Sequence, residues 1–458
     1  MSAPEAPSPP DRPSLDEAQR SFHEELSALV EGAVGSGTVT AVAAGVVFHE
    51  EPGPAGPDDP TATRHVTTAR HVATAGCSRD ALFRISSMTK PLTTACALVL
   101  AERAALPFDT PLGDLLPELA DMPVLDAPDG PLDRTHPPRR APTFEDLLTY
   151  TWGFGMDMPM FAAAGAGDPW PVFAAAEDLH TFGPPVPRTG LDRDTWLTRL
   201  SGLPLLTEPG ERWWYSSGSH VLGAWIERHT GLDLETALRR YLLDPWGLPD
   251  TTFTATTEGE RNRLGPVYET TADGLAVVDG PGLVDGLGAS AAGVAGSSVW
   301  TREPAFHDAA AGLLSTVDDC LEAGRRLLAG DTPGLPTDLR DRMLSDRLTP
   351  DQRRATDPQG LLGEGLGWGY GLAVHPDGSY GWDGGFGSIW RNLPGPGTAA
   401  DAAGASGAVA GSRTGATIVV LTDRIVDAEG WPPVCAQVLD LARAHLDDPA
   451  VGPGSAPA

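Results

Sequence analysis

A serine and a lysine stand three residues apart, at Ser87 and Lys90, within the stretch FRISSMTKPLT. Lys90 is the only lysine in 458 residues, so the other 31 of the 32 basic residues are arginines. Arginine keeps its proton inside a protein, whereas a buried lysine amine can lose its proton and become a base. A serine hydroxyl becomes a strong nucleophile when a neighbouring base takes its proton. The pair predicts nucleophilic chemistry at Ser87; the alternative is an ordinary surface lysine.

The segment that follows Ser87 is predicted to be a buried helix, because apolar residues recur at helical spacing at Leu92, Cys96, Val99 and Leu100. Residues three apart share a helix face, so the side chains of Ser87 and Lys90 are expected to face the same way. The start of a helix also offers N–H groups without partners and a partial positive charge. Such a site can stabilise a developing oxyanion.

Composition limits the classes of partner. The chain is long enough for a two-lobed unit or two domains, and it has no run of eighteen apolar residues, so we expect no membrane span. Its formal net charge of −30 would repel phosphate backbones, so we expect no nucleic-acid partner. The oligomeric state is left open.

The four cysteines and eleven histidines are scattered without metal-binding spacing, so we expect no metal and no other cofactor. The cysteine spacing also predicts buried free thiols. The first residues lack the basic and apolar regions of a secretory signal, which favours the cytoplasm. We expect residues 1–13 to be a disordered leader and residues 451–458 a disordered tail.

The predicted elements indicate an α+β fold. A helix is expected at 14–34 and again at 311–328 and 434–446, and strands are expected at 38–48, 64–75, 368–375, 380–392 and 417–422. The two ends of the chain, 14–85 and about 306–446, are expected to build one sheet lobe. A mostly helical lobe is expected over about 86–305. An Ala/Gly/Ser-rich stretch at 394–415 is predicted to be a flexible insertion, and 155–190 to be a lid or a packed loop.

Five stretches occur in the order found in one known family: FRISSMTKPLT, LLTYTWGF, PGERWWYSSGSHVLG, GLLSTVDD and YGWDGGFGSIW. The chain resembles the serine β-lactamase and penicillin-binding protein family over roughly residues 38–446. The resemblance is to the class C-like branch, which includes family VIII-type carboxylesterases and D-amino-acid peptidases. It implies a β-lactamase/DD-peptidase-like fold, with an antiparallel sheet flanked by helices beside a mostly helical lobe.

The resemblance implies roles for individual residues. Ser87 would be the nucleophile, and either Lys90 or Tyr215 would act as the general base, a choice that the sequence leaves open. The N–H groups of Ser87 and Phe386 would form the oxyanion hole. Tyr215 could instead be a packing residue beside two tryptophans, and the glycine-rich stretch around Gly384 an ordinary hairpin.

Substrate-binding residues are expected at Tyr150, Trp152, Ser217, Trp382, Asp383, Gly384 and Gly385. Two of these positions depart from the family pattern: Ser217 stands where the family has asparagine, and Asp383 stands where it has a cationic or polar residue. An ionised Asp383 would repel an anionic substrate, unless Arg391 points back toward the cleft. An apolar acyl pocket, or plain core, is expected from Trp152, Phe154, Met156, Met158 and Trp382.

Together with the resemblance, these observations predict a serine hydrolase that cleaves a small-molecule ester or amide through an acyl-enzyme on Ser87. In the first place we expect a carboxylesterase acting on neutral or cationic substrates. The alternatives within enzymes are a β-lactamase, a D-amino-acid peptidase or DD-carboxypeptidase, and an acyltransferase. Outside enzymes, the alternative is an inactive binding domain on the same fold, which the lone lysine argues against.

Overall fold

The computed structural model describes the chain over residues 15–50, 67–179, 190–279, 298–356, 360–395, 415–427 and 430–447. The predicted leader and tail lie outside these ranges, as do residues 396–414 of the predicted insertion and 180–189 of the predicted lid or loop. The limits of the two predicted lobes stay a prediction.

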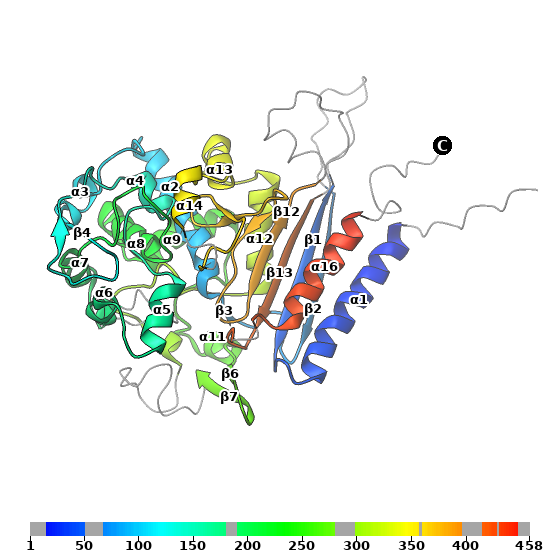
Figure 1. Cartoon of the computed structure of the whole chain (residues 1–458). Helices are drawn as coiled ribbons and strands as arrows, with labels where there is room; N and C mark the ends of the chain where they lie inside the picture. Colours follow the sequence, from blue (N-terminus) through cyan, green and yellow to red (C-terminus); the bar gives the residue numbers. More distant parts are fainter. Residues whose placement is uncertain are drawn as a thin grey trace, which may run out of the picture.

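A seven-stranded sheet forms the frame of the molecule, in the order β2-β1-β13-β12-β11-β10-β9 (Figure 1). All neighbouring strands pair antiparallel. The strands come from both ends of the chain: β1 Val42–Glu50, β2 Thr67–Ala75, β9 Gly367–Trp368, β10 Ala373–Val374, β11 Tyr380–Gly381, β12 Ile389–Leu393 and β13 Gly415–Thr422. The pairing of β1 with β13 brings the two ends together and confirms the predicted α+β class.

Two helices cover the outer face of this sheet: α1 Leu15–Gly35 and α16 Pro433–Asp447 lie side by side across it (Figure 1). One core cluster fills the space between them and the sheet. Alternate residues of a strand face opposite sides, so Val42, Ala44 and Val46 face this layer while Ala43 and Val47 face the other. The predicted first and last helices are confirmed.

The inner face of the sheet packs against α12 Val317–Ala329. Gly45 on β1 allows this close approach, because a Cβ there would lie 2.4 Å from Leu321 Cδ1. The helix that begins after Ser87, α2 Thr89–Arg103, lies deeper, and each residue from Thr89 to Ala101 is buried. The large core cluster that includes α2 also contains buried side chains from many of the elements in the middle of the chain.

Three predicted elements are wrong in their extent. The strand expected at 368–375 is two short strands, β9 and β10, which pair with each other across a turn at Gly371, whose φ is +71°. The strand expected at 380–392 is likewise two, β11 and β12, separated by a turn at 384–388. Hairpins replace long strands because glycines permit tight turns that hydrophobicity patterns do not register. The helix expected from 311 begins only at Val317, after Thr316 caps it.

The middle of the chain is built from short elements. The helices are α3 Leu112–Leu115, α4 Phe144–Leu148, α5 Met158–Gly165, α6 Pro171–Ala175, α7 Arg193–Ser201, α8 Ser217–Thr230, α9 Leu234–Leu238, a π-helical turn Arg239–Leu243, α10 Asp244–Trp246, α11 Glu258–Arg263, α13 Thr337–Met343 and α14 Pro350–Ala355. Two-stranded pairs are β3 Phe83–Arg84 with β8 Leu314–Ser315, β4 Val124–Leu125 with β5 Thr135–His136, and β6 Val267–Thr271 with β7 Gly274–Asp279.

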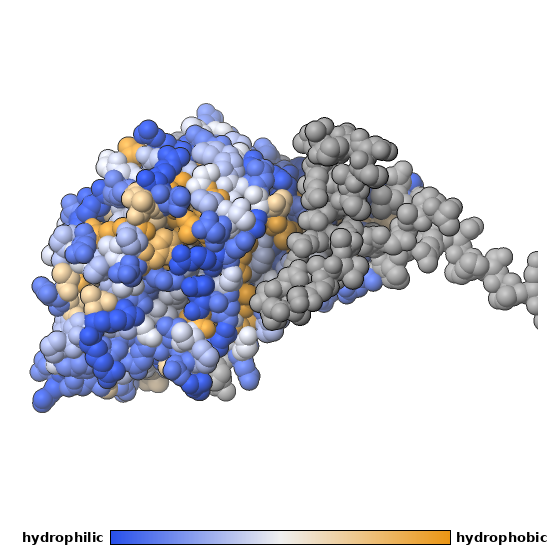
Figure 2. All heavy atoms as spheres, turned by 90° about the horizontal axis from the view of Figure 1, so that it is seen from above, coloured by the Kyte–Doolittle hydropathy of each residue, from blue (hydrophilic) through white to orange (hydrophobic). Residues whose placement is uncertain are grey.

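The surface is mainly hydrophilic on the face shown in Figure 2, with hydrophobic residues scattered over its helical part. None of the helices that the structure describes combines the length and apolar character that crossing a bilayer requires. All four cysteines lie in the described ranges and none forms a disulfide; three are buried, and Cys77 is half-buried.

Candidate active site

Ser87 lies in a single 3₁₀ turn, Ser86–Met88, which joins β3 to α2. The residue before it, Ser86, has a φ of +47°, in a region that side chains other than glycine seldom adopt. The backbone just upstream is fixed by a 3.0 Å hydrogen bond from Ile85 N to Leu313 O. A strained, well-anchored turn therefore presents the Ser87 hydroxyl at the entrance of α2.

Lys90 lies one turn further on and is 1% exposed. Its Nζ is 3.0 Å from Ser87 Oγ and donates to Ala310 O at 2.9 Å. Burial lowers the pKa of Lys90 to about 7, although the negative charge of Asp308 opposes this shift. A substantial fraction of the amine is therefore neutral near pH 7.

Tyr215 approaches Ser87 from the other side, and its hydroxyl donates to Ser87 Oγ at 2.7 Å. The Trp382 indole N–H donates to the same hydroxyl at 2.8 Å. Two 3.0 Å backbone hydrogen bonds with Met156 hold Tyr215 in place. Burial raises the pKa of Tyr215 well above its ordinary value, while the hydrogen bonds with Ser87 and Trp382 oppose that shift. The three predicted catalytic residues are thus in direct contact.

Aromatic rings support Tyr215 from behind. Its ring lies 5.5 Å from those of both Trp213 and Trp382, measured between centroids. The rings of Trp368 and Trp382 meet edge to face at 4.9 Å. Lys90 Nζ lies over the Tyr215 ring, 4.4 Å from its centroid. The packing leaves the phenol little freedom to turn away from Ser87.

The hairpin that follows Trp382 lies directly against the turn that carries Ser87. A Cβ on Gly384 would lie 2.5 Å from Ile85 O, so only glycine allows this approach. The turn is closed by a 2.8 Å hydrogen bond from Gly384 N to Ser388 O. Phe386 is 1% exposed, and its ring packs edge to face on Trp300 at 5.6 Å. The hairpin therefore lies next to the Ser87 turn, and the oxyanion-hole roles of the Ser87 and Phe386 N–H groups stay a prediction.

Three predicted substrate-binding residues are buried. Ser217 is 0% exposed, donates to Phe154 O at 2.5 Å and accepts from Trp152 Nε1 at 3.1 Å. Tyr150 and Trp152 are also 0% exposed, and the Tyr150 hydroxyl hydrogen-bonds to Ser219. These side chains are occupied in holding the segment 150–156 against the start of α8, so a direct contact with substrate stays a prediction.

Asp383 and Trp382 point in opposite directions. Both carboxylate oxygens of Asp383 accept from Arg391 Nη2, at 3.1 and 2.9 Å. On β12 the residues two positions either side of Arg391, Ile389 and Leu393, belong to the core beneath α1 and α16. Arg391 thus pairs with Asp383 on the outer side of the sheet. Burial raises the pKa of Asp383, and the Arg391 charge opposes this shift.

The predicted acyl-pocket residues divide into two groups. Trp152 and Phe154 are 0% exposed and Met156 is 7% exposed, as in a protein core. Trp382 is half-buried next to Tyr215, and Met158 is 43% exposed at the start of α5. Trp382 and Met158 therefore remain the candidates with accessible surface.

Sequence reasoning missed the groups that hold Lys90 from behind. Ala310 contributes only a backbone carbonyl, which any residue possesses. Asp308 and His220 form a buried pair, with Nε2 3.1 Å from Oδ1. These residues lie on separate elements far apart in the chain, and no spacing pattern announces their contact. Trp382 was expected to touch substrate, and its hydrogen bond to Tyr215 was not foreseen.

Comparison with known proteins identifies the family. The family model described as Beta-lactamase matches residues 28–424. The chain belongs to the β-lactamase family. Protein Rv1367c of Mycobacterium tuberculosis (strain ATCC 25618 / H37Rv) is 34% identical over 336 residues, which cover 69% of this chain and 75% of that protein. Esterase EstB of Burkholderia gladioli is 32% identical over 328 residues, 68% of this chain and 74% of EstB. The predicted family is confirmed.

A solved structure of EstCE1, described as a hydrolase with promiscuous acyltransferase activity, has the same fold as this β-lactamase family member. It superposes with a TM-score of 0.64 at 20% sequence identity and covers 93% of this chain and 99% of EstCE1. The predicted β-lactamase-like fold is confirmed.

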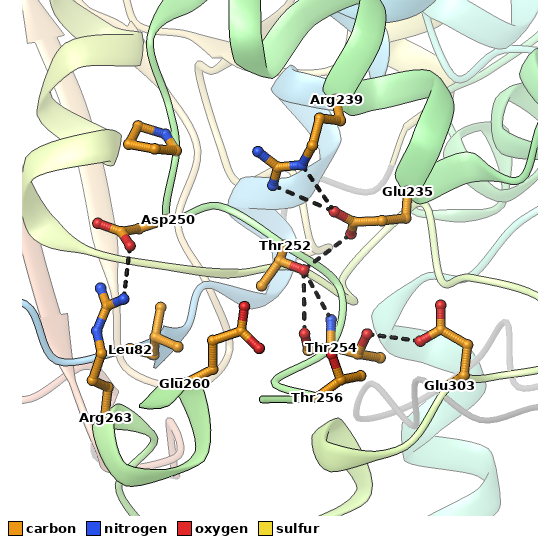
Figure 3. Close-up of a pocket in the computed structure, with 11 residues that line it drawn as sticks. Leu82, Glu235, Arg239, Asp250, Thr252, Thr254, Thr256, Glu260, Arg263 and Glu303 are labelled. Atoms are coloured by element: carbon orange, nitrogen blue, oxygen red, sulfur yellow. Dashed lines mark hydrogen bonds and ion pairs between the residues drawn. The ribbon is translucent and has the colours of Figure 1, made fainter. Parts of the chain in front are cut away.

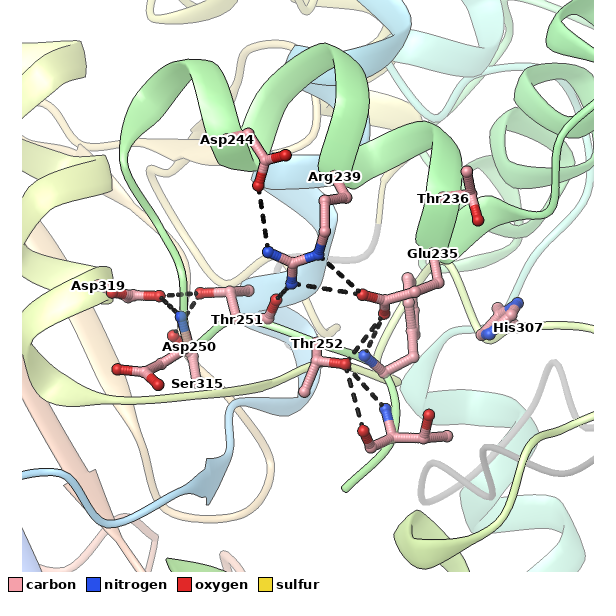
Figure 4. Close-up of polar contacts among 12 residues, drawn as sticks. Glu235, Thr236, Arg239, Asp244, Asp250, Thr251, Thr252, His307, Ser315 and Asp319 are labelled. Atoms are coloured by element: carbon pink, nitrogen blue, oxygen red, sulfur yellow. Dashed lines mark hydrogen bonds and ion pairs between the residues drawn. The ribbon is translucent and has the colours of Figure 1, made fainter. Parts of the chain in front are cut away.

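The protein also contains a cavity of about 500 Å³ beside α9 and α11 (Figure 3). None of the predicted site residues lines it. Two ion pairs lie in its lining: Arg239 Nη2 lies 3.4 Å from Glu235 Oε1 (Figure 4), and Arg263 Nη1 lies 2.7 Å from Asp250 Oδ1 (Figure 3). The pair of Arg263 with Asp250 fastens the loop after α10 to α11, and a 2.6 Å hydrogen bond from Phe253 N to Glu235 Oε2 fastens the same loop to α9. Within the described residues, no group of three or more His, Cys, Asp or Glu side chains could hold a metal ion.

Proposed function

We propose that the protein is a serine esterase that forms an acyl-enzyme on Ser87. One observation carries the proposal: the Ser87 hydroxyl lies between a buried amine at 3.0 Å and a buried phenol at 2.7 Å. Esterase EstB, 32% identical to this chain, points to the same reaction. The intact contacts at Ser87 favour an enzyme over an inactive binding domain.

The direction of the hydrogen bonds suggests which residue is the base. The Trp382 N–H can only donate and the Ala310 carbonyl can only accept. The hydrogen bonds between them can therefore all point one way: Trp382 donates to Tyr215, Tyr215 to Ser87, Ser87 to Lys90, and Lys90 to Ala310 O. This chain requires a neutral Lys90 that accepts the serine proton. A pKa of about 7 allows that state, whereas the raised pKa of Tyr215 disfavours a phenolate. Lys90 is therefore the proposed base.

In the proposed acylation, the Ser87 proton passes to Lys90 while Oγ forms a bond to the substrate carbonyl carbon. The carbonyl oxygen becomes an oxyanion, for which the N–H groups of Ser87 and Phe386 are the proposed donors. The oxyanion then re-forms the carbonyl and breaks the bond between that carbon and the alcohol oxygen. This oxygen takes the Tyr215 proton as it leaves, and Tyr215 receives the proton held by Lys90. Water then attacks the acyl-enzyme by the same steps in reverse, and an acceptor alcohol in place of water would give acyl transfer.

The pairing of Asp383 with Arg391 favours uncharged ester substrates. The substrates of β-lactamases and DD-peptidases carry a carboxylate, and Arg391 was the residue that could have attracted it. Its charge is neutralised by Asp383 on the outer side of the sheet. The unpaired cysteines favour a reducing compartment, and we propose the cytoplasm.

The test compares wild type with Ser87→Ala on a short-chain p-nitrophenyl ester and, in parallel, on a chromogenic cephalosporin. We expect ester turnover that Ser87→Ala abolishes and little cephalosporin turnover. Ser86→Ala, at the adjacent serine outside the contacts of Lys90 and Tyr215, controls for effects on the turn. Ester hydrolysis that persists in Ser87→Ala contradicts the proposal, and faster cephalosporin hydrolysis would favour a β-lactamase.

A further inference from the structure

The segment 308–313 lies against the first turns of α2 and contacts Lys90 and Thr93. Its carbonyls accept two side chains of the helix: Lys90 Nζ donates to Ala310 O at 2.9 Å, and Thr93 Oγ1 donates to Ala309 O at 2.7 Å. The position of the amine therefore depends on the shape of this segment.

Asp308 determines that shape. Its Oδ1 accepts the backbone N–H groups of Ala310 and Ala311, each at 2.9 Å, and its backbone oxygen accepts that of Gly312 at 2.8 Å. Asp308 is 6% exposed. A buried carboxylate bonded to two backbone N–H groups fixes a turn in one conformation. The Ala310 carbonyl is thereby aimed at Lys90.

His220 on α8 is the side chain that meets this carboxylate, with Nε2 3.1 Å from Asp308 Oδ1. A carboxylate can only accept, so Nε2 carries the hydrogen. The imidazole is buried and stacks on Trp196, with ring centroids 6.1 Å apart. Its Nδ1 has no hydrogen-bond partner among the residues that the structure describes. The polar function of His220 is thus directed at Asp308.

The charges around Lys90 are few. Asp308 raises the pKa of Lys90 against the larger effect of burial. Burial disfavours the Asp308 carboxylate, but His220, the Ala310 N–H and Lys90 outweigh it and hold the pKa of Asp308 below its ordinary value. Among the residues that the structure describes, the other titratable group that faces the amine is Tyr215, which lies near both Asp308 and the paired Asp383. Asp308 is therefore the main negative charge acting on Lys90.

We propose that His220 and Asp308 are a pair of positioning residues that hold the Lys90 amine on Ser87 and set its charge state at neutral pH. This inference rests on the proposed function, in which Lys90 takes the serine proton. The pair acts through the 308–311 backbone and through the charge of the carboxylate.

The lone lysine makes a direct test possible. Protein grown with lysine carrying ¹³C at Cε gives one lysine resonance, that of Lys90, whose chemical shift follows the protonation of the amine. We expect a midpoint of about 7 in wild type. Asp308→Asn keeps the acceptor oxygen but removes the charge, so its midpoint falls by about one pH unit.

His220 supplies a matched pair of variants. In His220→Leu the buried carboxylate loses its donor and relies more on the lysine charge, so the midpoint rises by about half a unit or more. We also expect kcat for the p-nitrophenyl ester to fall while KM is unchanged. His220→Gln restores an N–H at this position, so both the midpoint and kcat return toward wild type.

Unchanged midpoints in folded Asp308→Asn and in His220→Leu would overturn the proposal. If Asp308→Asn fails to fold, the comparison of His220→Leu with His220→Gln decides alone, and equal midpoints in the two overturn it. The titration needs no substrate. A protein without esterase activity would therefore contradict the proposed function and leave the test of His220 and Asp308 intact.

Discussion

Two buried basic side chains, Arg84 and Lys90, stand three residues before and after Ser87 in the sequence. Arg84 has an ionic partner, whereas the hydrogen-bond partners of Lys90 are neutral. Arg84 forms an ion pair with Asp279 and donates to Gly265 O at 2.9 Å and to Ser298 Oγ at 3.1 Å. The hydrogen bonds of Lys90 go to a hydroxyl and a carbonyl, both neutral. Asp308 is the carboxylate whose charge acts on Lys90, but its own contacts are with backbone N–H groups and His220.

This difference separates a structural cation from a reactive one. An ion pair in a dry interior holds a guanidinium charged, and arginine does not release its proton in any case. An amine surrounded by neutral groups is penalised for its charge, so its pKa falls to about 7. The same substitution at the two positions should therefore damage different properties.

Lys90→Met is expected to have the largest effect, and on activity alone. Methionine has a similar length but cannot take a proton, so kcat for a p-nitrophenyl ester should fall by about 10²–10⁴-fold. The melting temperature should change little, because removing a desolvated amine offsets the loss of its hydrogen bond to Ala310 O. Lys90→Arg keeps a charge and should be equally inactive. Activity within about threefold of wild type in both variants would refute the role of Lys90.

Arg84→Met should instead damage stability. It leaves the Asp279 carboxylate buried at 1% side-chain exposure without its cation, which costs about 3–5 kcal/mol in the free energy of unfolding. Denaturant titration measures the loss. Adding Asp279→Asn should recover part of it, because the unpaired charge is removed. The esterase activity of each folded molecule should remain. An Arg84→Met protein that is as stable as wild type but inactive would contradict the structural role of Arg84.

Trp382→Phe should have the smallest effect, and it tests whether the hydrogen bond to Tyr215 contributes to activity. Phenylalanine keeps the ring packing on Tyr215 but removes the N–H that donates to its hydroxyl at 2.8 Å. Loss of one such hydrogen bond should lower kcat/KM by about two- to tenfold. Trp368→Phe is the matched control, because its indole N–H has no partner among the described residues. Equal effects of the two variants would show that ring packing alone matters.

The contacts within one helical turn were predictable from sequence. Ser87 and Lys90 are three residues apart on one buried segment, so their spacing alone brought them together. Tyr215 required the order of five motifs, since it comes from a distant element. The sheet and its two covering helices followed from strong apolar periodicity at both ends of the chain.

The directions of the predicted substrate-binding residues Trp382 and Asp383 were not predictable, because they depend on which face of the sheet each side chain of a short segment points to. A one-residue difference sends Trp382 to Tyr215 and Asp383 to Arg391 on the other side. The tight turns at Gly371 and Gly384 reset that alternation within two predicted strands. The contact of His220 with Asp308 joins two elements through tertiary packing, which periodicity does not register.

The rate at which a fluorophosphonate labels the intact protein, followed by mass spectrometry across pH 5 to 9, tests the central claim most directly. The account predicts a single adduct on Ser87, absent in Ser87→Ala. The neutral form of Lys90 accepts the serine proton, so the labelling rate should rise with pH to a plateau, with a midpoint of about 7. An adduct on another residue, or a rate on Ser87 that is independent of pH over this range, would contradict it.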